Sequence, residues 1–308
     1  MPNSSQLSYF TFGGYFDIGP LKYLLFSVLL CLYMLIICAN VLLVVVICMN
    51  RSLREPMYIF LCSLLINELY GSTGLFPSLL QQILSDIHTI SASFCYLQIF
   101  CLYTYVNVQF YNLAVMSYDR YLAICFPLQY NSRMTSVKVA VLITLIWIIP
   151  VLVIVVMISL NASLQLCGNV IDTLYCNNYS VVKLACYDTT VNNIYGLIYT
   201  FVVLFGLTIL ILYTYIKILK VCFSGSKQTR QKAVSTCTPH LASLLNFSCG
   251  CFLEIAQSRL DISSAPIMLR SFLSLYFLIC QPLYNPLLYG LKLTKISMIC
   301  KSLLSGRI

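Results

Sequence analysis

The chain has 308 residues, of which 60% are hydrophobic and only 9% are charged, and its formal net charge is +9. A soluble protein of this length needs far more charge on its surface, so this composition and the mean hydropathy of +0.89 exclude a soluble enzyme or binding domain. They indicate an integral membrane protein. We expect an all-α fold, because continuous helices satisfy their own backbone hydrogen bonds within lipid.

Apolar runs long enough to cross the hydrocarbon core, which takes roughly 20 residues, recur along the whole chain. They predict a seven-helix bundle with short connections and no room for a soluble domain. Residues 1–22 form a tail before the bundle, and residues 292–308 form a short tail after it. The predicted helices span about residues 23–49, 57–84, 94–126, 138–160, 189–222, 232–257 and 268–291.

The basic side chains predict the orientation of this bundle. Most of the 18 Lys and Arg residues fall in the loops after the first, third and fifth helices and in the final tail. The positive-inside rule therefore places the amino terminus outside the cell and the carboxyl terminus in the cytosol. The basic residues 227–232 lie between two predicted membrane helices, so we do not expect nucleic acid as a partner.

An adjacent acid and base, Asp119 and Arg120, end an apolar stretch that carries no other charge back to Cys95. Ionisable residues at the edge of the hydrocarbon are costly. Such a pair either marks the membrane boundary or persists because it has a partner and a function.

The residues around this pair favour a function. Residues 117–130, SYDRYLAICFPLQY, resemble the third-helix signature of odorant receptors, a branch of the rhodopsin-like G-protein-coupled receptors. Residues 56–61, PMYIFL, and 232–241, KAVSTCTPHL, resemble the family's motifs in helices two and six, and residues 285–289, NPLLY, match the NPxxY element of helix seven. The sixth helix departs from the family further along, where Ser248 and Cys249 replace the usual Tyr-Gly after Phe247.

The resemblance implies a receptor that switches between two states. Arg120 would leave Asp119 when a ligand binds, and the inner end of helix six would move outward. A heterotrimeric G protein of the stimulatory or olfactory type would then bind and raise cyclic AMP. The residues expected in coupling and switching are Asp119, Arg120, Tyr121, Tyr215, Lys232, His240, Asn285, Pro286 and Tyr289.

Helical spacing predicts which side chains face the ligand. Turns counted back from Arg120 along helix three reach Val106 and Leu102, and a similar face of helix six follows Ser248. These side chains are mostly apolar, which suits a small organic ligand, although each one alone is equally consistent with packing inside the bundle. The predicted ligand-binding residues are Leu102, Tyr103, Val106, Asn107, Phe110, Tyr199, Ser248, Cys251, Phe252 and Ile255.

The charge of the ligand is left open. Receptors for biogenic amines carry an Asp on helix three where this chain has Leu102, so an amine is not expected to bind there. Glu254 offers an amine another anchor, whereas Arg259 and Arg270 offer one to an anion.

Cysteines and one acid suggest further sites. Of 16 cysteines only Cys95, Cys167, Cys176 and Cys186 fall on the predicted outer side, where the environment is oxidising. Four cysteines allow three pairings, and the resemblance implies Cys95–Cys176 and Cys167–Cys186. Glu68 lies in mid-helix, where the family has an Asp that helps to hold sodium. We expect either a sodium site at Glu68, or a Glu68 that is protonated or hydrogen-bonded to Asn40 and Asn285.

Asn3 begins a glycosylation sequon in the predicted outer tail, and Asn161 and Asn178 begin two more in outer segments. The sequence shows neither a phosphate-binding glycine loop nor a nucleophile with a base, so we predict no enzyme activity, no cofactor and no metal centre. A transporter is the main alternative class, but we see no repeated halves. A receptor for a peptide or lipid is the other alternative. The expected location is the cell membrane of olfactory sensory neurons.

Overall fold

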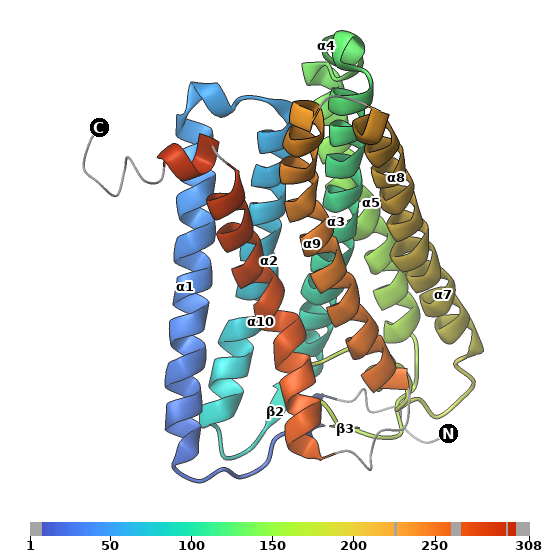
Figure 1. Ribbon diagram of the computed structural model, residues 1–308. Helices are drawn as coiled ribbons and strands as arrows, with labels where there is room; N and C mark the ends of the chain where they lie inside the picture. Colours follow the sequence, from blue (N-terminus) through green and yellow to red (C-terminus); the bar gives the residue numbers. More distant parts are fainter. Residues whose placement is uncertain (1–7, 225–226, 260–265, 294, 300–308) are drawn as a thin grey trace.

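The computed structural model describes residues 8–224, 227–259, 266–293 and 295–299. Within these residues, seven long helical rods lie side by side in one bundle (Figure 1). The rods are α1 (Leu21–Met49), α2 (Pro56–Leu84), α3 (Ala92–Cys125), α5 (Ser136–Ala162), the continuous rod of α7 (Thr190–Phe201), η3 (Val202–Leu207) and α8 (Thr208–Ser224), α9 (Lys227–Arg259), and α10 (Ile267–Lys292).

The side chains are arranged as in a membrane protein, with apolar groups outside and polar groups inside. α1 and α5 expose large apolar residues such as Leu24, Leu35 and Leu152. The buried side chains of α3 include Asn112 and Asp119. Among the described residues, α1, α2, α5 and the rod Thr190–Ser224 are long and apolar enough to span a membrane. The protein is a helical membrane bundle.

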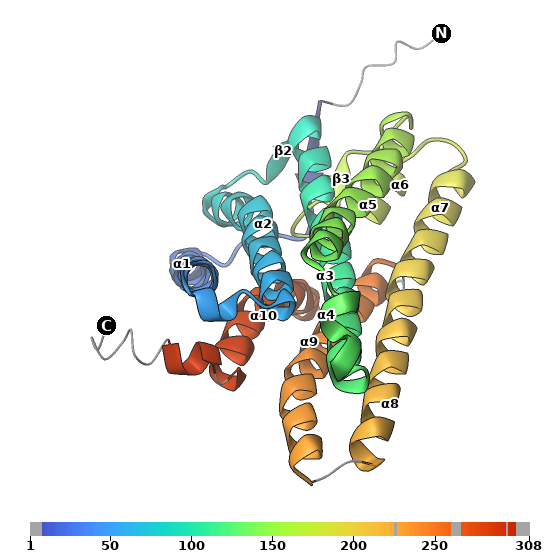
Figure 2. The same ribbon diagram turned by 90° about the horizontal axis from the view of Figure 1, so that it is seen from above.

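α3 is the central helix of the bundle. It contacts α2, α5, α8 and α9, and the view along the bundle shows these helices around it (Figure 2). The helix begins where the Oγ of Ser91 accepts a hydrogen bond from the backbone N–H of Phe94 at 3.4 Å, a typical N-cap. It ends before η2 (Pro127–Gln129) and the short α4 (Tyr130–Arg133), which lead into α5.

The fifth rod contains a π-helical turn, η3, which the sequence analysis does not predict. A π turn accommodates an extra residue within an α-helix, and such turns are frequent at functional sites. Hydrophobic runs do not reveal it, because the side chains on both sides of the turn are equally apolar. The turn lies beside the cavity described below, to which it contributes Val203 and Leu204.

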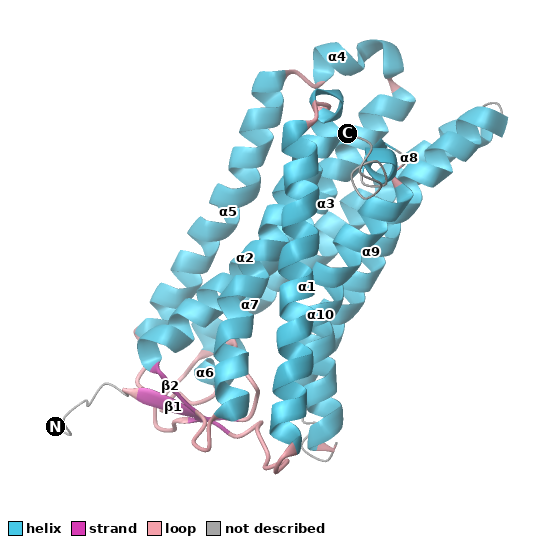
Figure 3. Ribbon diagram, turned by 90° about the vertical axis from the view of Figure 1, so that its left-hand side faces the viewer, coloured by secondary structure: helices cyan, strands magenta, loops and turns pink. Residues whose placement is uncertain are grey.

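A small sheet covers one end of the bundle (Figure 3), which we call the sheet end. Its strands are β1 (Tyr9–Phe12), β2 (Thr89–Ser91) and β3 (Val170–Ile171), in the order β2-β1-β3. The prediction of an all-α chain is wrong at this point. Strands of two to four residues carry no readable periodicity, and they pair here across long sequence separations.

The opposite end carries α4, and we call it the α4 end (Figure 1). The Oγ1 of Thr135 caps the start of α5 there by accepting a hydrogen bond from the backbone N–H of Lys138 at 3.3 Å. The 3-10 turn η1 (Arg51–Leu53) joins α1 to α2, and Pro56 occupies the first turn of α2, where its missing N–H is not needed.

Candidate functional site

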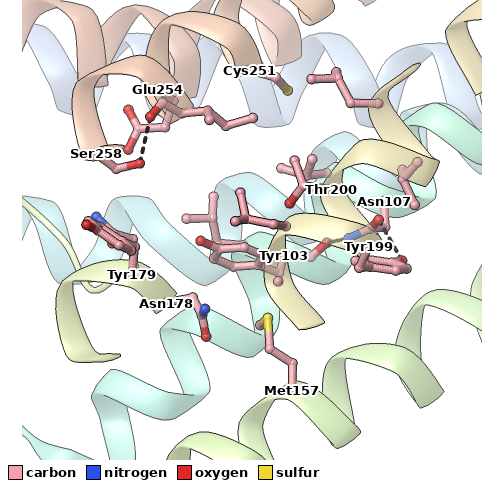
Figure 4. Close-up of a pocket in the computed structure, with 18 of the residues that line it drawn as sticks. Tyr103, Asn107, Met157, Asn178, Tyr179, Tyr199, Thr200, Cys251, Glu254 and Ser258 are labelled. Atoms are coloured by element: carbon pink, nitrogen blue, oxygen red, sulfur yellow. Dashed lines mark hydrogen bonds between the residues drawn. The ribbon is translucent and has the colours of Figure 1, made fainter. Parts of the chain in front are cut away.

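A cavity of about 130 Å³ lies toward the sheet end, between α3, α7, η3 and α9 (Figure 4). We call it the α3–α9 cavity. Its walls are mainly apolar, and a few polar groups converge on it, as in sites for small organic molecules. The predicted ligand-binding residues that line it are Leu102, Tyr103, Val106, Asn107, Phe110, Tyr199, Cys251 and Ile255.

The two remaining predicted residues, Ser248 and Phe252, do not line this cavity. The side chain of Phe252 is 61% exposed and faces away from the bundle. Successive residues of an α-helix are rotated by about 100°, and only the Cys251 side of this turn meets α3. The prediction that Ser248 and Phe252 line the cavity is wrong. Helical spacing suggested a wider face of α9 than the one that meets the cavity.

Two polar side chains join α3 to α7 within the cavity. The hydroxyl of Tyr199 donates a hydrogen bond to Asn107 Oδ1 at 2.7 Å, and Asn107 Nδ2 donates to the backbone oxygen of Tyr103 at 2.6 Å. Both ends of the Asn107 amide are therefore occupied. A ligand that competes for Asn107 would alter the contact between the two helices.

Charged groups lie near the mouth of the cavity. Glu254 lines it, and its Oε2 atom is buried and has no hydrogen-bond partner among the described residues. The guanidinium of Arg259 lies 4.1 Å from the ring centre of Tyr179 and donates to Asn193 Oδ1 at 3.3 Å. The cavity thus has an acidic side chain in its wall and a cation at its edge.

Loop residues that the sequence analysis does not predict close the cavity at the sheet end. Asn177, Asn178 and Tyr179 come from the start of α6 (Asn178–Val182) and the residue before it. The disulfide Cys95–Cys176 and a hydrogen bond from the Cys176 backbone N–H to Gln98 Oε1, at 2.8 Å, hold this segment against α3. Their position directly after Cys176 is the signal that could have identified them.

The second disulfide joins Cys167 to Cys186. The two disulfides are the pairs that the resemblance implies. Together they fasten the long segment between α5 and α7 at the sheet end, which reduces the freedom of the chain that covers the cavity.

Two of the three predicted sequons fall on buried asparagines. Asn161 is 1% exposed and hydrogen-bonds to Asn178, which is 6% exposed. Asn192 Nδ2 also donates to Asn161 Oδ1 at 3.0 Å. An asparagine buried in this way cannot carry a glycan in the folded protein. Asn3 lies outside the described residues.

A buried polar network links four helices in the middle of the bundle. Glu68 of α2 accepts hydrogen bonds from the Tyr105 hydroxyl at 2.9 Å, from Gln109 Nε2 at 2.8 Å, and from Asn285 Nδ2. Asn285 Oδ1 in turn accepts from the Ser243 hydroxyl of α9 at 2.7 Å.

This network bears on the sodium site that the resemblance implies. Donor groups face both carboxylate oxygens of Glu68, whereas a cation requires oxygen ligands around it. This arrangement matches the hydrogen-bonded alternative, and the sodium site at Glu68 stays a prediction. Asn285 is a partner as expected, but Asn40 is not, because its Nδ2 donates to the backbone oxygen of Pro282 at 3.0 Å. Pro286, one residue after Asn285, is buried in α10.

The adjacent charges Asp119 and Arg120 lie toward the α4 end of α3. The carboxylate of Asp119 is fully buried, and it accepts a hydrogen bond from Arg120 Nε at 2.9 Å. Its other oxygen accepts from the hydroxyl of Tyr130 in α4 at 2.7 Å. Tyr130 is a partner that the sequence analysis misses, since nothing in its spacing places α4 against α3.

The other predicted switch residues lie on α3, α8, α9 and α10. Tyr215 is buried, and its hydroxyl has no hydrogen-bond partner among the described residues. The hydroxyl of Tyr289 and the Nδ1 atom of His240 are 3.2 Å apart. Tyr121 packs edge-on against Phe126. The side chain of Lys232 lies outside the described residues.

The fold and these sites define a class: a helical membrane bundle with a ligand-sized cavity toward one end and a charge pair near the other end of the same central helix. A sequence profile described as "Olfactory receptor" matches residues 29–307. The chain belongs to the olfactory receptor family, which is a family of receptors and not of enzymes.

Individual relatives agree with this assignment over nearly their whole length. Olfactory receptor 11A1 of Homo sapiens is 33% identical over 306 residues, which cover 98% of this chain and 95% of that protein. Olfactory receptor 10J5 of Homo sapiens is 32% identical over 292 residues, or 94% and 93% of the two chains. Olfactory receptor 4E2 of Mus musculus is 31% identical over 307 residues, or 99% and 98%.

Proposed function

We propose that the protein is an odorant receptor of the cell membrane of olfactory sensory neurons. It binds a small organic molecule from the extracellular side in the α3–α9 cavity. Binding activates a heterotrimeric G protein of the stimulatory or olfactory type and raises cyclic AMP. The observation that carries the proposal is the arrangement on α3, where the cavity residues and the buried Asp119–Arg120 pair occupy different turns of one helix.

In the proposed topology all seven rods cross the membrane. The sheet end lies outside the cell and the α4 end lies in the cytosol. Two observations support this orientation. Both disulfides lie at the sheet end, and disulfides persist in an oxidising environment. The basic loops predicted to be cytosolic lie at the opposite end.

The ligand acts by binding the active state more tightly than the resting state. Asn107 and Tyr199 join α3 to α7, so a ligand that competes for either group changes the relation between these helices. The apolar walls select a largely apolar molecule. Glu254 in the cavity wall favours one that carries a hydrogen-bond donor.

In the active state Arg120 leaves Asp119, and the α4 end of α9 swings outward. The hydroxyl of Tyr215 has no partner among the described residues and is the acceptor that the released guanidinium would meet. The G protein then contacts Arg120, the loop that contains α4, and the basic ends of α8 and α9, including Lys232. His240, Asn285, Pro286 and Tyr289 allow α9 and α10 to change their packing.

Replacement of Arg120 by Ala tests this proposal. The variant should lose the cyclic AMP response to an odorant found by a ligand-panel screen, whereas its amount at the cell surface and its ligand binding should be unchanged. Arg51→Ala is a suitable control, because Arg51 is an exposed cation of the turn between α1 and α2. A full response in Arg120→Ala would contradict the proposed switch.

A further inference from the structure

A second and larger cavity, of about 510 Å³, lies at the sheet end between α1, α2 and α10. We call it the α1–α10 cavity. It shares no lining residue with the α3–α9 cavity. Its inner wall is apolar and is formed by Leu25 and Leu29 of α1, Leu79 and Ile83 of α2, and Leu275 of α10. A volume of this size is typical of a site for an organic ligand.

The segment around Tyr15 covers the cavity and forms its roof. Tyr15 lies in the segment between β1 and α1, and its hydroxyl donates to the backbone oxygen of Leu174 at 2.8 Å. Burial raises the pKa of this hydroxyl well above its usual value, so the hydroxyl remains a donor. The ring of Tyr15 stacks on the imidazole of His88, with 4.5 Å between the ring centres. The roof is therefore fastened to two other segments of the sheet end.

Polar groups gather at one edge of the cavity, below this roof. Lys22 Nζ lies 2.9 Å from Asp86 Oδ1, and the two side chains are 25% and 88% exposed, respectively. His88 Nδ1 is buried and has no hydrogen-bond partner among the described residues. Asp17 also lines the cavity, but its Oδ1 atom already accepts a hydrogen bond from the Gly19 N–H at 2.8 Å.

A ligand can replace Asp86 as the partner of Lys22. The hydrogen bond from Lys22 holds the pKa of Asp86 below its usual value, so Asp86 is ionised at neutral pH. Because Asp86 is almost fully exposed, water can solvate it once Lys22 turns away, and exposed ion pairs of this kind are weak. Lys22 is mostly covered and remains at the cavity edge. The His88 side chain also lines this cavity.

The contacts between α1 and α10 leave an approach from the membrane. Asn40 donates to the backbone oxygen of Pro282, and Leu43 lies near Gly290, both in the half of these helices nearer the α4 end. At the sheet end, the α10 side of the cavity is formed by Met268 and Phe272, which are 69% and 63% exposed.

We propose that the α1–α10 cavity is a second ligand site that binds a single-chain carboxylate amphiphile, a long-chain fatty acid, from the membrane leaflet at the sheet end. The carboxylate binds Lys22, and the chain lies against Leu25, Leu29 and Leu275. The site is separate from the proposed odorant cavity and does not depend on it.

The test uses the full-length protein in nanodiscs and a hexadecanoic acid that carries a diazirine in its chain. After irradiation, mass spectrometry compares the labelling of Leu25 and Leu29 with that of Leu24 and Val28, which face outward on the same turns of α1. The acid should label the cavity residues preferentially. Its methyl ester should label them about tenfold less, because the ester lacks the charge-assisted hydrogen bonds.

Three variants separate the contributions of Lys22, of Asp86 and of the apolar space to binding of the acid. Lys22→Gln should lower the preferential labelling about tenfold, and Asp86→Asn should raise it, because Asp86 no longer competes for Lys22. Leu25→Trp should block labelling of Leu29 by filling the cavity while Lys22 is retained. The proposal is overturned if acid and ester label equally, if Lys22→Gln labels like the unaltered protein, or if the label appears only on α3, α7 and α9.

Discussion

At the scale of single residues, the acid of the central charge pair has two partners, not one. Asp119 is held by its neighbour Arg120 and also by the hydroxyl of Tyr130. The second bond ties α4 to α3. We take both bonds to belong to the resting arrangement, in which α4 is held against α3.

Replacement of Tyr130 by Phe should raise the basal activity of the receptor. The change removes a hydrogen bond to a charged acceptor, which contributes about 1.5–3 kcal/mol and corresponds to roughly a tenfold or larger shift between resting and active states. The measurement is ligand-independent cyclic AMP at equal surface expression.

Tyr118→Phe is the matched control for this change. The Tyr118 hydroxyl accepts a hydrogen bond from Lys138 Nζ at 3.0 Å and makes none to Asp119 among the described residues. Its loss should leave basal activity unchanged. If both variants behave like the unaltered protein, the bond to Tyr130 does not hold the resting state.

Residues placed by helical spacing were predicted better than residues placed by loops. Val106 and Phe110 reach the α3–α9 cavity because they share one face of a regular helix. Asn178 and Tyr130 escape prediction because a disulfide and a short irregular connection place them. Helical spacing misplaced Phe252. The neighbouring Cys251 is buried, whereas Phe252 is exposed, because one residue along a helix turns the side chain to another side.

At the scale of elements, α2 and α3 pack closely where glycine allows it. A Cβ atom at Gly71 would lie 2.4 Å from the ring of Tyr105, whose hydroxyl donates to Glu68. We expect Gly71→Ala to displace Tyr105 and disturb the buried network. Such overpacking typically costs about 1–3 kcal/mol, so the melting temperature of the purified protein in detergent should fall.

Gly206→Ala is the control, since no atom lies within 4 Å of its added Cβ. Alanine is favoured over glycine in a helix by about 1 kcal/mol, so this variant should melt at the same or a higher temperature. A melting temperature of Gly71→Ala equal to that of Gly206→Ala would show that the two helices pack less tightly than described.

The burial of Asn161 and Asn178 predicts that their sequons are not used in the mature protein. Ser163→Ala and Ser180→Ala each destroy a sequon and leave the buried asparagine in place. Neither variant should change the mass of the surface receptor on a gel before or after glycosidase treatment. A loss of mass by one glycan in either variant would mean that the segment folds differently from the structure.

The helices were predictable as elements because lipid requires long apolar runs, and the clean run at residues 138–160 falls within α5 (Ser136–Ala162). The π turn η3 and the strands β1, β2 and β3 could not be predicted from the sequence. Their conformations depend on contacts between distant segments, which a single run of residues does not encode.

At the scale of the whole molecule, fewer helices qualify as membrane spans by their composition than there are long rods in the bundle. Among the described residues, α1, α2, α5 and the rod Thr190–Ser224 qualify by length and apolar composition. α3 falls short because it carries buried polar groups, among them Asn112 and Asp119. These side chains find their partners in neighbouring rods, so the bundle as a whole is compatible with lipid although single helices are less apolar.

The seven rods and the basic loops together predict the topology of the chain. If all seven rods cross the membrane, the two termini must lie on opposite sides, with the amino terminus outside because the basic loops remain in the cytosol. An epitope fused before residue 1 should bind antibody on intact cells, and one fused after residue 308 should bind only after the cells are permeabilised. An even number of crossings would instead place both epitopes on one side. Exposure of the carboxyl-terminal epitope alone on intact cells would reverse the orientation, and with it the assignment of the sheet end to the ligand and the α4 end to the G protein.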